Sequence, residues 1–352
     1  FILFFLYHEK QEYMAIEAWL VAGVAIWMAI WWATEAIPVA ATAFLPLVIF
    51  DPLGIKTIKS VAEPYAHPTV FLFLGGFIVA SSIERWGLHK RIALAVVDNV
   101  GSDGRRLIAS FMFVSAILSM WMTNTSTTMM LLPIVISVSR VISDNMPNLN
   151  LETKNNFQIA MLLGLAYSAS IGGVATLIGT APNAFLIGFL SDNYNIEIGF
   201  AEWMMVGIPI SIIMLPLVWI ALTRFLFPFN IPASQSVTHH LRSLRNDLGL
   251  IGIAERRVAI IFIILIIAWM LRLPFTQWLG IEGISDTSIV MTIAMFLFLC
   301  PSGESENTFL LSWNDLSRLP WGVLIIFGGG LSLASAVSDS GLALWLGEQL
   351  AP

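Results

Sequence analysis

A stretch of 33 residues without a charged side chain, Leu107 to Ser139, constrains the fold of this chain more than any other segment. As one α-helix it would be about 50 Å long, whereas the hydrocarbon core of a bilayer is about 30 Å thick. Arg105 and Arg106 precede it and Arg140 follows it, and basic residues collect in cytoplasmic loops. Both ends are therefore expected on the cytoplasmic side, and we predict a re-entrant hairpin or two short spanning helices.

The turn of this hairpin is predicted at Thr123, Asn124 and Thr125, in the middle of a run of hydroxyl-bearing residues. An unsatisfied polar group in hydrocarbon costs several kcal/mol, so these side chains must face protein, water or a ligand. For Thr127 and Thr128 we favour a hydrogen bond to the backbone carbonyl three or four residues earlier. Asn124 differs, because a carboxamide at this depth needs more partners than its own helix supplies.

Composition places the whole chain in the class of all-α polytopic membrane proteins. Hydrophobic residues make up 57% of its 352 residues, charged residues make up 11%, and the mean hydropathy is +0.83. Soluble domains carry about 25% charged residues, so a soluble class is excluded. The single Cys300 excludes an intramolecular disulfide, and the adjacent His239 and His240 would point about 100° apart on a helix. We expect a lipid bilayer and small ions as partners, no transition metal and no nucleic acid.

A second uncharged stretch, from Asn155 to Ser191, is also too long for one crossing. Its interruption is predicted at Gly172-Gly173 and at the run from Gly179 to Asn183, because glycine frees the backbone and Pro182 removes a hydrogen-bond donor. The sequence therefore predicts a discontinuous helix. We place its acidic end, 192–202, on the outer side.

The remaining segments follow from apolar runs and the charged residues between them. The apolar run at 1–6 is interpreted as the end of a truncated first helix, and 88–100 as a helix lying in the membrane interface. Residues 51–68 are predicted to be a polar loop, and the arginine-rich residues 224–257 a cytoplasmic loop. Further spans are predicted at 16–34, 39–50, 69–84, 204–221, 258–270, 288–300 and 324–337.

An internal repeat links two distant parts of the chain. The offset is 254 residues, the difference between Gly75 and Gly329, and it is constant over the matched segment. The identical pairs are Phe73/Phe327, Gly75/Gly329, Gly76/Gly330, Ala80/Ala334, Ser81/Ser335, Gly87/Gly341 and Leu88/Leu342. An odd number of predicted crossings between the copies would give them opposite orientations, as in inverted-repeat transporters. At the same offset, a second hairpin turn would fall beyond Pro352, so we expect the chain to stop before the second half of its site.

The two interruptions together predict an ion-coupled anion site. Carbonyl and hydroxyl oxygens suit a hard monovalent cation, while the N-terminal ends of half-helices suit a carboxylate or sulfate oxygen. Neither stretch holds an arginine or lysine that could neutralise an anion. An anion would therefore need helix dipoles alone or cations carried with it, which favours cation symport over uniport.

Four ordered motifs resemble the divalent anion:sodium symporter family over nearly the whole chain. They are Trp31-Trp32-Ala33-Thr34-Glu35-Ala36-Ile37-Pro38, Ala66-His67-Pro68 with Phe71-Leu72-Phe73-Leu74-Gly75-Gly76-Phe77, Leu118-Ser119-Met120-Trp121-Met122-Thr123-Asn124-Thr125-Ser126-Thr127, and Ile178-Gly179-Thr180-Ala181-Pro182-Asn183-Ala184. The resemblance implies sodium-coupled transport of dicarboxylates, tricarboxylates or sulfate, with Na+ as the coupling ion and no other cofactor. We expect a succinate-like di- or tricarboxylate as the substrate.

The resemblance also assigns roles to residues of both interruptions. It implies sodium binding by Ser119, Thr123, Asn124 and Gly179. It implies carboxylate binding by Thr123, Asn124, Thr125 and Thr180, with Pro182 in the same turn. This chain departs from the family pattern in two places, since Thr123 stands where serine is usual and Ala181 where a first proline is usual.

The family resemblance further implies a homodimer in the cell (inner) membrane that moves substrate by an elevator-like mechanism. On this basis 1–106 are expected to be scaffold helices of the first repeat, and 258–352 an incomplete scaffold of the second. Residues 107–224 would be half of the transport domain, and 225–257 a cytoplasmic linker. The transport half comprises the hairpin 107–142, the broken helix 155–191 and the helix 204–224.

Three alternatives remain open from the sequence. The first is an anion exchanger or a sodium:sulfate symporter on the same fold, although an exchanger would be expected to hold a fixed cation near the sodium position. The second is an intramembrane enzyme, which would need a nucleophile and a base at depth, whereas the five histidines lie outside both polar clusters. We therefore expect a transporter and no enzyme. The third is that these 352 residues are an inactive fragment.

Overall fold

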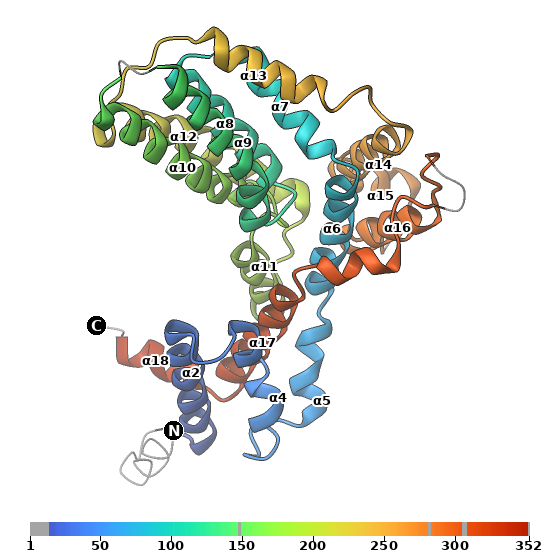
Figure 1. The fold of residues 1–352 in the computed structure, drawn as a ribbon. Coiled ribbons are helices and arrows are strands. Elements are labelled where there is room, and N and C mark those ends of the chain that lie inside the picture. Colours follow the sequence, from blue (N-terminus) through green and yellow to red (C-terminus); the bar gives the residue numbers. More distant parts are fainter. Residues whose placement is uncertain (1–13, 101, 147–148, 281–282, 305–307, 351–352) are drawn as a thin grey trace. The chain divides into compact units, whose positions relative to one another are not determined.

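The computed structural model describes residues 14–100, 102–146, 149–280, 283–304 and 308–350 (Figure 1). The regular secondary structure of these residues is helical apart from one isolated β-bridge, and loops connect the helices. By length and composition, six helices of this described part can cross a membrane. A seventh span is added if α14 (Ile253–Met270) and α15 (Arg272–Leu279), which meet at a bend of 65°, are counted together. The predicted all-α polytopic class is confirmed, while the interpretation of residues 1–6 lies outside the described residues.

The chain forms two compact units. One contains 1–74, 184–198 and 320–352, and the other contains 75–183 and 199–319. Two helices belong to both units, namely α6 (Pro68–Arg85) and α11 (Ala181–Tyr194).

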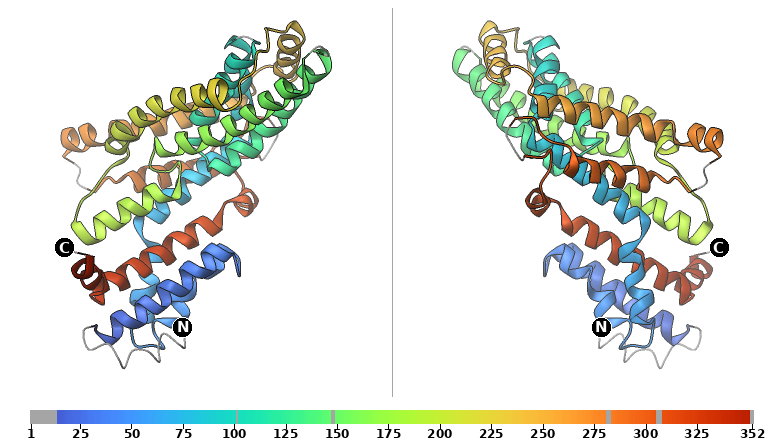
Figure 2. Two further views of the ribbon diagram at one scale, coloured as in Figure 1. Left: turned by 90° about the vertical axis from the view of Figure 1, so that its left-hand side faces the viewer. Right: turned by 90° about the vertical axis from the view of Figure 1, so that its right-hand side faces the viewer.

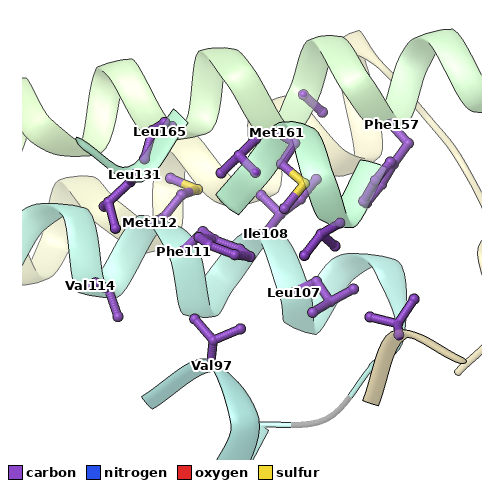
Figure 3. Close-up of a cluster of buried hydrophobic side chains, with 14 of the residues drawn as sticks. Val97, Leu107, Ile108, Phe111, Met112, Val114, Leu131, Phe157, Met161 and Leu165 are labelled. Atoms are coloured by element: carbon purple, nitrogen blue, oxygen red, sulfur yellow. The ribbon is translucent and has the colours of Figure 1, made fainter. Parts of the chain in front are cut away.

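The larger unit is built around α8 (Gly104–Ser119) and α10 (Leu151–Val174), which pack along most of their length. Small residues allow this close approach, since a Cβ on Gly164 would lie 3.2 Å from Met112 and one on Gly172 would lie 2.1 Å from the Ala116 carbonyl oxygen. Figure 3 shows the apolar core between these helices, in which Phe111 of α8 and Phe157 of α10 are fully buried. The unit also contains α7 (Leu88–Val100), α9 (Asn124–Asn145), α12 (Phe200–Ile220), the π-helical continuation η3 (Ala221–Leu226), α13 (Gln235–Asn246), α14, α15, α16 (Asp286–Leu299) and η4 (Trp313–Arg318).

The smaller unit packs α2 (Ile16–Thr34) beside α17 (Trp321–Asp339), as both views of Figure 2 show. A Cβ on Gly329 of α17 would lie 2.3 Å from the Ala43 carbonyl oxygen, so this helix also depends on a glycine for close packing. The unit is completed by α3 (Val39–Thr42), α4 (Leu45–Ile49), α5 (Ile58–Ala62), η2 (Glu63–Ala66) and α18 (Leu342–Leu350).

Three segments differ from the sequence-based predictions. The predicted span 39–50 is two short helices separated at Ala43 and Phe44. The predicted loop 51–68 contains α5 and η2, because the Thr57 hydroxyl caps α5 by accepting a hydrogen bond from the Ser60 amide.

The third difference is α13, which lies inside the predicted cytoplasmic loop 224–257 and runs beside α7 in Figure 1. Val237 and Leu241, four residues apart, are buried on one face of α13. Arg242 and Arg245 form ion pairs with Asp98 of α7. Helical spacing of apolar residues was present in this loop, but its net charge concealed it.

The internal repeat is confirmed in the backbone. The helix α6 ends at Arg85 and α7 begins at Leu88, and α17 ends at Asp339 and α18 begins at Leu342, at the same offset. The matched glycines between these helices are both left-handed, with φ of 71° at Gly87 and 77° at Gly341. The repeat is therefore a helix, a left-handed glycine and a second helix.

Candidate functional site

The hairpin is interrupted where α8 ends at Ser119 and α9 begins at Asn124. The turn lies at residues 120–123, slightly earlier than predicted, because Thr123 is the N-cap of α9 and its hydroxyl accepts a hydrogen bond of 3.2 Å from the Ser126 amide. Asn124 and Thr125 thus belong to the first turn of α9, where backbone N–H groups lack helical partners.

Ser119 and Asn124 lie on the two sides of this turn and contact each other directly. The buried Ser119 hydroxyl donates a hydrogen bond of 2.6 Å to Asn124 Oδ1. The Thr123 hydroxyl donates to the Ser126 hydroxyl at 2.9 Å, while the Thr125 side chain is exposed. The side chains of the turn are therefore fixed largely by one another.

The second interruption lies between Val174, the last residue of α10, and Ala181, the first of α11. Asn183 closes this break, because its amide nitrogen donates to the carbonyl oxygens of Gly173 at 2.9 Å and of Thr176 at 2.8 Å. The predicted discontinuous helix is confirmed, with its break at residues 175–180.

The two interruptions meet at their glycines. A Cβ on Gly173 would lie 2.6 Å from Asn124 Oδ1 and 3.1 Å from the Gly179 carbonyl oxygen. A Cβ on Gly179 would lie 2.5 Å from the Gly173 carbonyl oxygen and 2.9 Å from that of Ser119. Four uncharged oxygens, the carbonyls of Ser119, Gly173 and Gly179 and the side-chain oxygen of Asn124, therefore converge. We call these four atoms the oxygen cluster.

The oxygen cluster fits a hard cation in chemical terms. Carbonyl and carboxamide oxygens are ligands for cations of this kind. Each has two lone pairs, so the Gly173 carbonyl and Asn124 Oδ1 keep one besides the lone pair that accepts from Asn183 or Ser119. The cluster joins Ser119, Asn124 and Gly179 from the predicted sodium-binding set. Thr123, the fourth member, contributes none of the four oxygens. Its hydroxyl caps α9 and is hydrogen-bonded to Ser126.

The predicted carboxylate-binding residues lie at the starts of two helices. Thr123, Asn124 and Thr125 are at the start of α9, and Thr180 and Pro182 are at the start of α11. Thr125 and Pro182 are exposed and Thr180 is half-buried. The structure therefore places the predicted residues at two helix N-termini. Among the described residues no hydrogen bond joins Thr125 to Thr180.

The prediction for the two neighbouring threonines is half right. The Thr128 hydroxyl donates to the Asn124 carbonyl oxygen at 2.8 Å, as predicted. Thr127 is fully buried, and its hydroxyl has no hydrogen-bond partner among the residues that the structure describes, so the prediction of a backbone hydrogen bond is wrong there.

Several residues that support the site were not identified from the sequence. The Thr176 hydroxyl donates to the Met120 carbonyl oxygen and so joins the two interruptions. The Trp203 indole donates to the Val174 carbonyl oxygen at 2.9 Å. Asn183 belongs to a motif that was recognised, but its donor role depends on the position of carbonyls across the break.

A cluster of aromatic side chains packs against Trp121 of the hairpin turn. Trp121 lies edge-on to Phe262 at 4.9 Å between ring centroids and parallel to Trp269 at 6.4 Å. Phe200 stacks on Trp269 at 4.0 Å, and the Trp269 indole donates to the Asp286 carbonyl oxygen at 3.0 Å. The turn is thus attached through Trp121 to α12 and α14, which are distant from it in sequence.

These features define a class of protein. Helices long and apolar enough to cross a membrane, two of them interrupted at one uncharged oxygen cluster, are the architecture of a multi-pass ion-coupled carrier.

The chain belongs to the family described as the sodium:sulfate symporter transmembrane region, whose profile matches residues 2–352. It is similar to the "Sodium-dependent dicarboxylate transporter SdcS" of Staphylococcus aureus strains bovine RF122 / ET3-1, USA300 and NCTC 8325 / PS 47. The identity to each is 37% over 357 residues, which cover 99% of this chain and 68% of the relative. The family resemblance drawn from the motifs is therefore confirmed.

Proposed function

We propose that this protein carries a small dicarboxylate across the cell membrane together with Na+, which binds at the oxygen cluster. The single observation that carries this proposal is the convergence of four uncharged oxygens from two helix interruptions. The family supplies sodium coupling in general, and the relatives named above are dicarboxylate transporters.

Sodium binding and substrate binding are coupled in this proposal through the hairpin turn. Asn124 Oδ1 and the Ser119, Gly173 and Gly179 carbonyls coordinate Na+, and the Thr123 cap holds Asn124 in place. The cation then stabilises a carboxylate at the N-terminal ends of α9 and α11, with Thr125, Thr180 and Pro182 beside it. Since neither interruption contains an arginine or lysine, a dianion binds well only when sodium is present.

The same proposal includes the movement that carries the substrate, the oligomeric state and the membrane in which the protein lies. Residues 107–224 would move as part of a transport domain against scaffold helices from 1–106 and 258–352, in an elevator-like movement within a homodimer of the inner membrane. Cross-linking of single-cysteine pairs, one in each part, would test the movement by a change in cross-linking rate when sodium and succinate are added.

The test is uptake of radiolabelled succinate into proteoliposomes with an inward sodium gradient. Wild-type uptake is expected to fall to background when choline replaces sodium. Asn124→Ala is expected to lower apparent sodium affinity by about 10-fold or more, because a hydrogen bond or ligand contact to a charged group is worth about 1.5 to 3 kcal/mol. Asn145→Ala is the matched control, since Asn145 lies at the far end of the same helix and, among the described residues, its side chain donates to the Val141 carbonyl oxygen alone.

Two outcomes would overturn the proposal. Uptake that is equal in sodium and in choline would exclude sodium coupling, and rapid succinate counterflow without sodium would favour an exchanger. A transporter in which Asn124→Ala and Asn145→Ala behave alike would exclude the oxygen cluster as the coupled site. Competition by unlabelled sulfate stronger than that by unlabelled succinate would assign the protein to sulfate.

A further inference from the structure

A cavity of about 800 Å³ lies in the larger unit, beside the helix that starts at the hairpin turn. Its wall is formed by the end of α6, the first turns of α7, one side of α9, the end of α13, and η4. This volume is enough for a small organic acid and several waters, since ligand pockets span about 300 to 1,000 Å³.

Five charged side chains line the cavity from α6, α7 and η4. Three are basic, Arg85, Lys90 and Arg318, and two are acidic, Glu84 and Asp315. Arg85 forms an ion pair with Asp315, so the two charges neutralise each other. Lys90 and Arg318 are exposed, and neither has an ion-pair partner within the described part of the chain. With the Glu84 carboxylate counted, three basic and two acidic side chains give the wall a net charge of +1, and two of its cations, Lys90 and Arg318, are available.

The cavity extends to the hairpin turn along α9. Ser126 lines it, and the Ser126 hydroxyl accepts the hydrogen bond of 2.9 Å from Thr123, the N-cap residue of the turn. The wall continues to Ile134, which is about 12 Å further along the helix at about 1.5 Å per residue. One end of the cavity is thus within one helical turn of Asn124.

The positions of the fixed cations and of the oxygen cluster are complementary. The two interruptions hold no arginine or lysine, whereas the adjoining cavity holds two that have no ion-pair partner among the described residues. A dianion attracted to the cavity would lie close to the turn without needing sodium. A cleft with an excess of one sign of charge raises the local concentration of oppositely charged ligands, and basic side chains outnumber acidic ones on this wall by three to two.

We propose that this cavity is a second, sodium-independent binding site for a small dicarboxylate, in which Lys90 and Arg318 each pair with one carboxylate. It takes its ligand class from the proposed function and adds a separate site with a different requirement. Because both cations are exposed, binding is weak and is screened by salt, for which the Debye length is about 8 Å at physiological ionic strength. The site holds substrate beside the turn before it enters or after it leaves the oxygen cluster.

Equilibrium binding of radiolabelled succinate to the purified protein tests this proposal. With choline in place of sodium and at low ionic strength, the wild type is expected to retain a weak binding component. The double variant Lys90→Gln/Arg318→Gln is expected to weaken that component by about 10-fold, and 0.5 M choline chloride by a similar factor, on the order of what loss of two charge pairs predicts.

Two controls make the result specific. Arg256→Gln removes an exposed arginine that does not line the cavity, and is expected to bind as the wild type does. The exchange Lys90→Arg/Arg318→Lys keeps both charges and is expected to retain binding, which separates loss of charge from loss of folding.

Asn124→Ala separates the two proposals. It is expected to lose the sodium-dependent component and to keep the sodium-independent one. Absence of any succinate binding by the wild type in choline would overturn the cavity site, as would unchanged binding by the double glutamine variant. If sodium adds nothing to wild-type binding while the choline component is present, the oxygen-cluster proposal fails and the cavity site stands.

Discussion

The hairpin turn and the helix break lie beside each other, and each contains an asparagine side chain that forms hydrogen bonds. One of these asparagines acts as a donor and the other as an acceptor. In the break, Asn183 is a donor, and its amide group holds two backbone carbonyls. In the turn, Asn124 is an acceptor, and its oxygen receives the Ser119 hydroxyl and lies against Gly173. Asn183 is 7% exposed, whereas Asn124 is half-buried.

This difference separates residues that maintain the site from residues that can bind at it. Asn183 has used both of its amide hydrogens in closing the chain, so its removal affects folding first. Asn124 Oδ1 has a lone pair beyond the one that Ser119 occupies, so it can also coordinate a cation. The same residue type at matched positions therefore gives different expected phenotypes, and each prediction below tests that division.

The largest effect is expected from Gly172→Ala, which would disrupt the close packing of α10 against α8, the two helices that lead into the interruptions. The added Cβ would lie 2.1 Å from the Ala116 carbonyl oxygen, a backbone atom that cannot move aside. We expect a loss of more than about 3 kcal/mol in the free energy of unfolding, measured as a lower thermal midpoint or a lower yield of monodisperse protein. Gly347→Ala is the control, because nothing lies within 4 Å of its added Cβ; equal effects of the two variants would contradict this packing.

Asn183→Ala is expected to rank next and to differ in kind from Asn124→Ala. It leaves the buried Gly173 and Thr176 carbonyls without their donor, which costs about 2 to 4 kcal/mol of stability with or without sodium. Asn124→Ala removes the acceptor of the buried Ser119 hydroxyl, so it is expected to lower the free energy of unfolding by about 1 to 3 kcal/mol in choline and, unlike Asn183→Ala, to abolish the stabilisation caused by added sodium. Midpoints of both variants in choline and sodium give the comparison, and the reverse pattern would interchange the two roles.

Thr176→Val is expected to have a moderate effect, since it removes the hydroxyl that donates to the Met120 carbonyl oxygen and keeps the side-chain shape. A loss of about 1 to 2 kcal/mol is expected, because Thr176 is fully buried and the carbonyl of the turn loses a partner. The measurement is thermal unfolding together with apparent sodium affinity. An unchanged sodium affinity would mean that the hydroxyl does not help to position the turn.

The smallest effect is expected from Thr127→Val and has the opposite sign. The buried Thr127 hydroxyl has no hydrogen-bond partner in the described part of the chain, so replacing it with a methyl group is expected to stabilise the protein by about 0.5 to 1 kcal/mol. Thermal unfolding in choline measures this. A loss of sodium affinity in the same variant would instead place Thr127 among the cation ligands.

The sequence was sufficient to predict the interruptions because their causes are local. Uncharged stretches too long for one crossing predict that a helix must end within them. The second stretch also has Gly179 and Pro182 at or beside its break, whereas the hairpin turn at 120–123 contains neither residue type. The bounds of the repeat were predictable from its matched residues, which include Gly87 and Gly341 just after the first helix of each copy.

The oxygen cluster could not be predicted in detail because it depends on contacts across the fold. Its Gly173 member lies in α10 and its Asn124 member in α9, and only the packing of these helices brings them together. The donor role of Asn183 and the attachment of Trp121 to Trp269, residues far apart in the sequence, have no local signal. The α13 helix shows the converse, a local apolar pattern concealed by basic residues.

The aromatic cluster gives the hairpin turn an intrinsic optical signal. The rings of Trp121 and Trp269 are 6.4 Å apart and inclined by 8°, and Phe262 stands nearly perpendicular to Trp121 at 88°. Two indoles so close couple their electronic transitions, and the coupling depends steeply on separation and angle. A displacement of the turn when a cation arrives should therefore change the near-ultraviolet circular dichroism of the unlabelled protein, so that occupancy of the oxygen cluster can be followed without a probe.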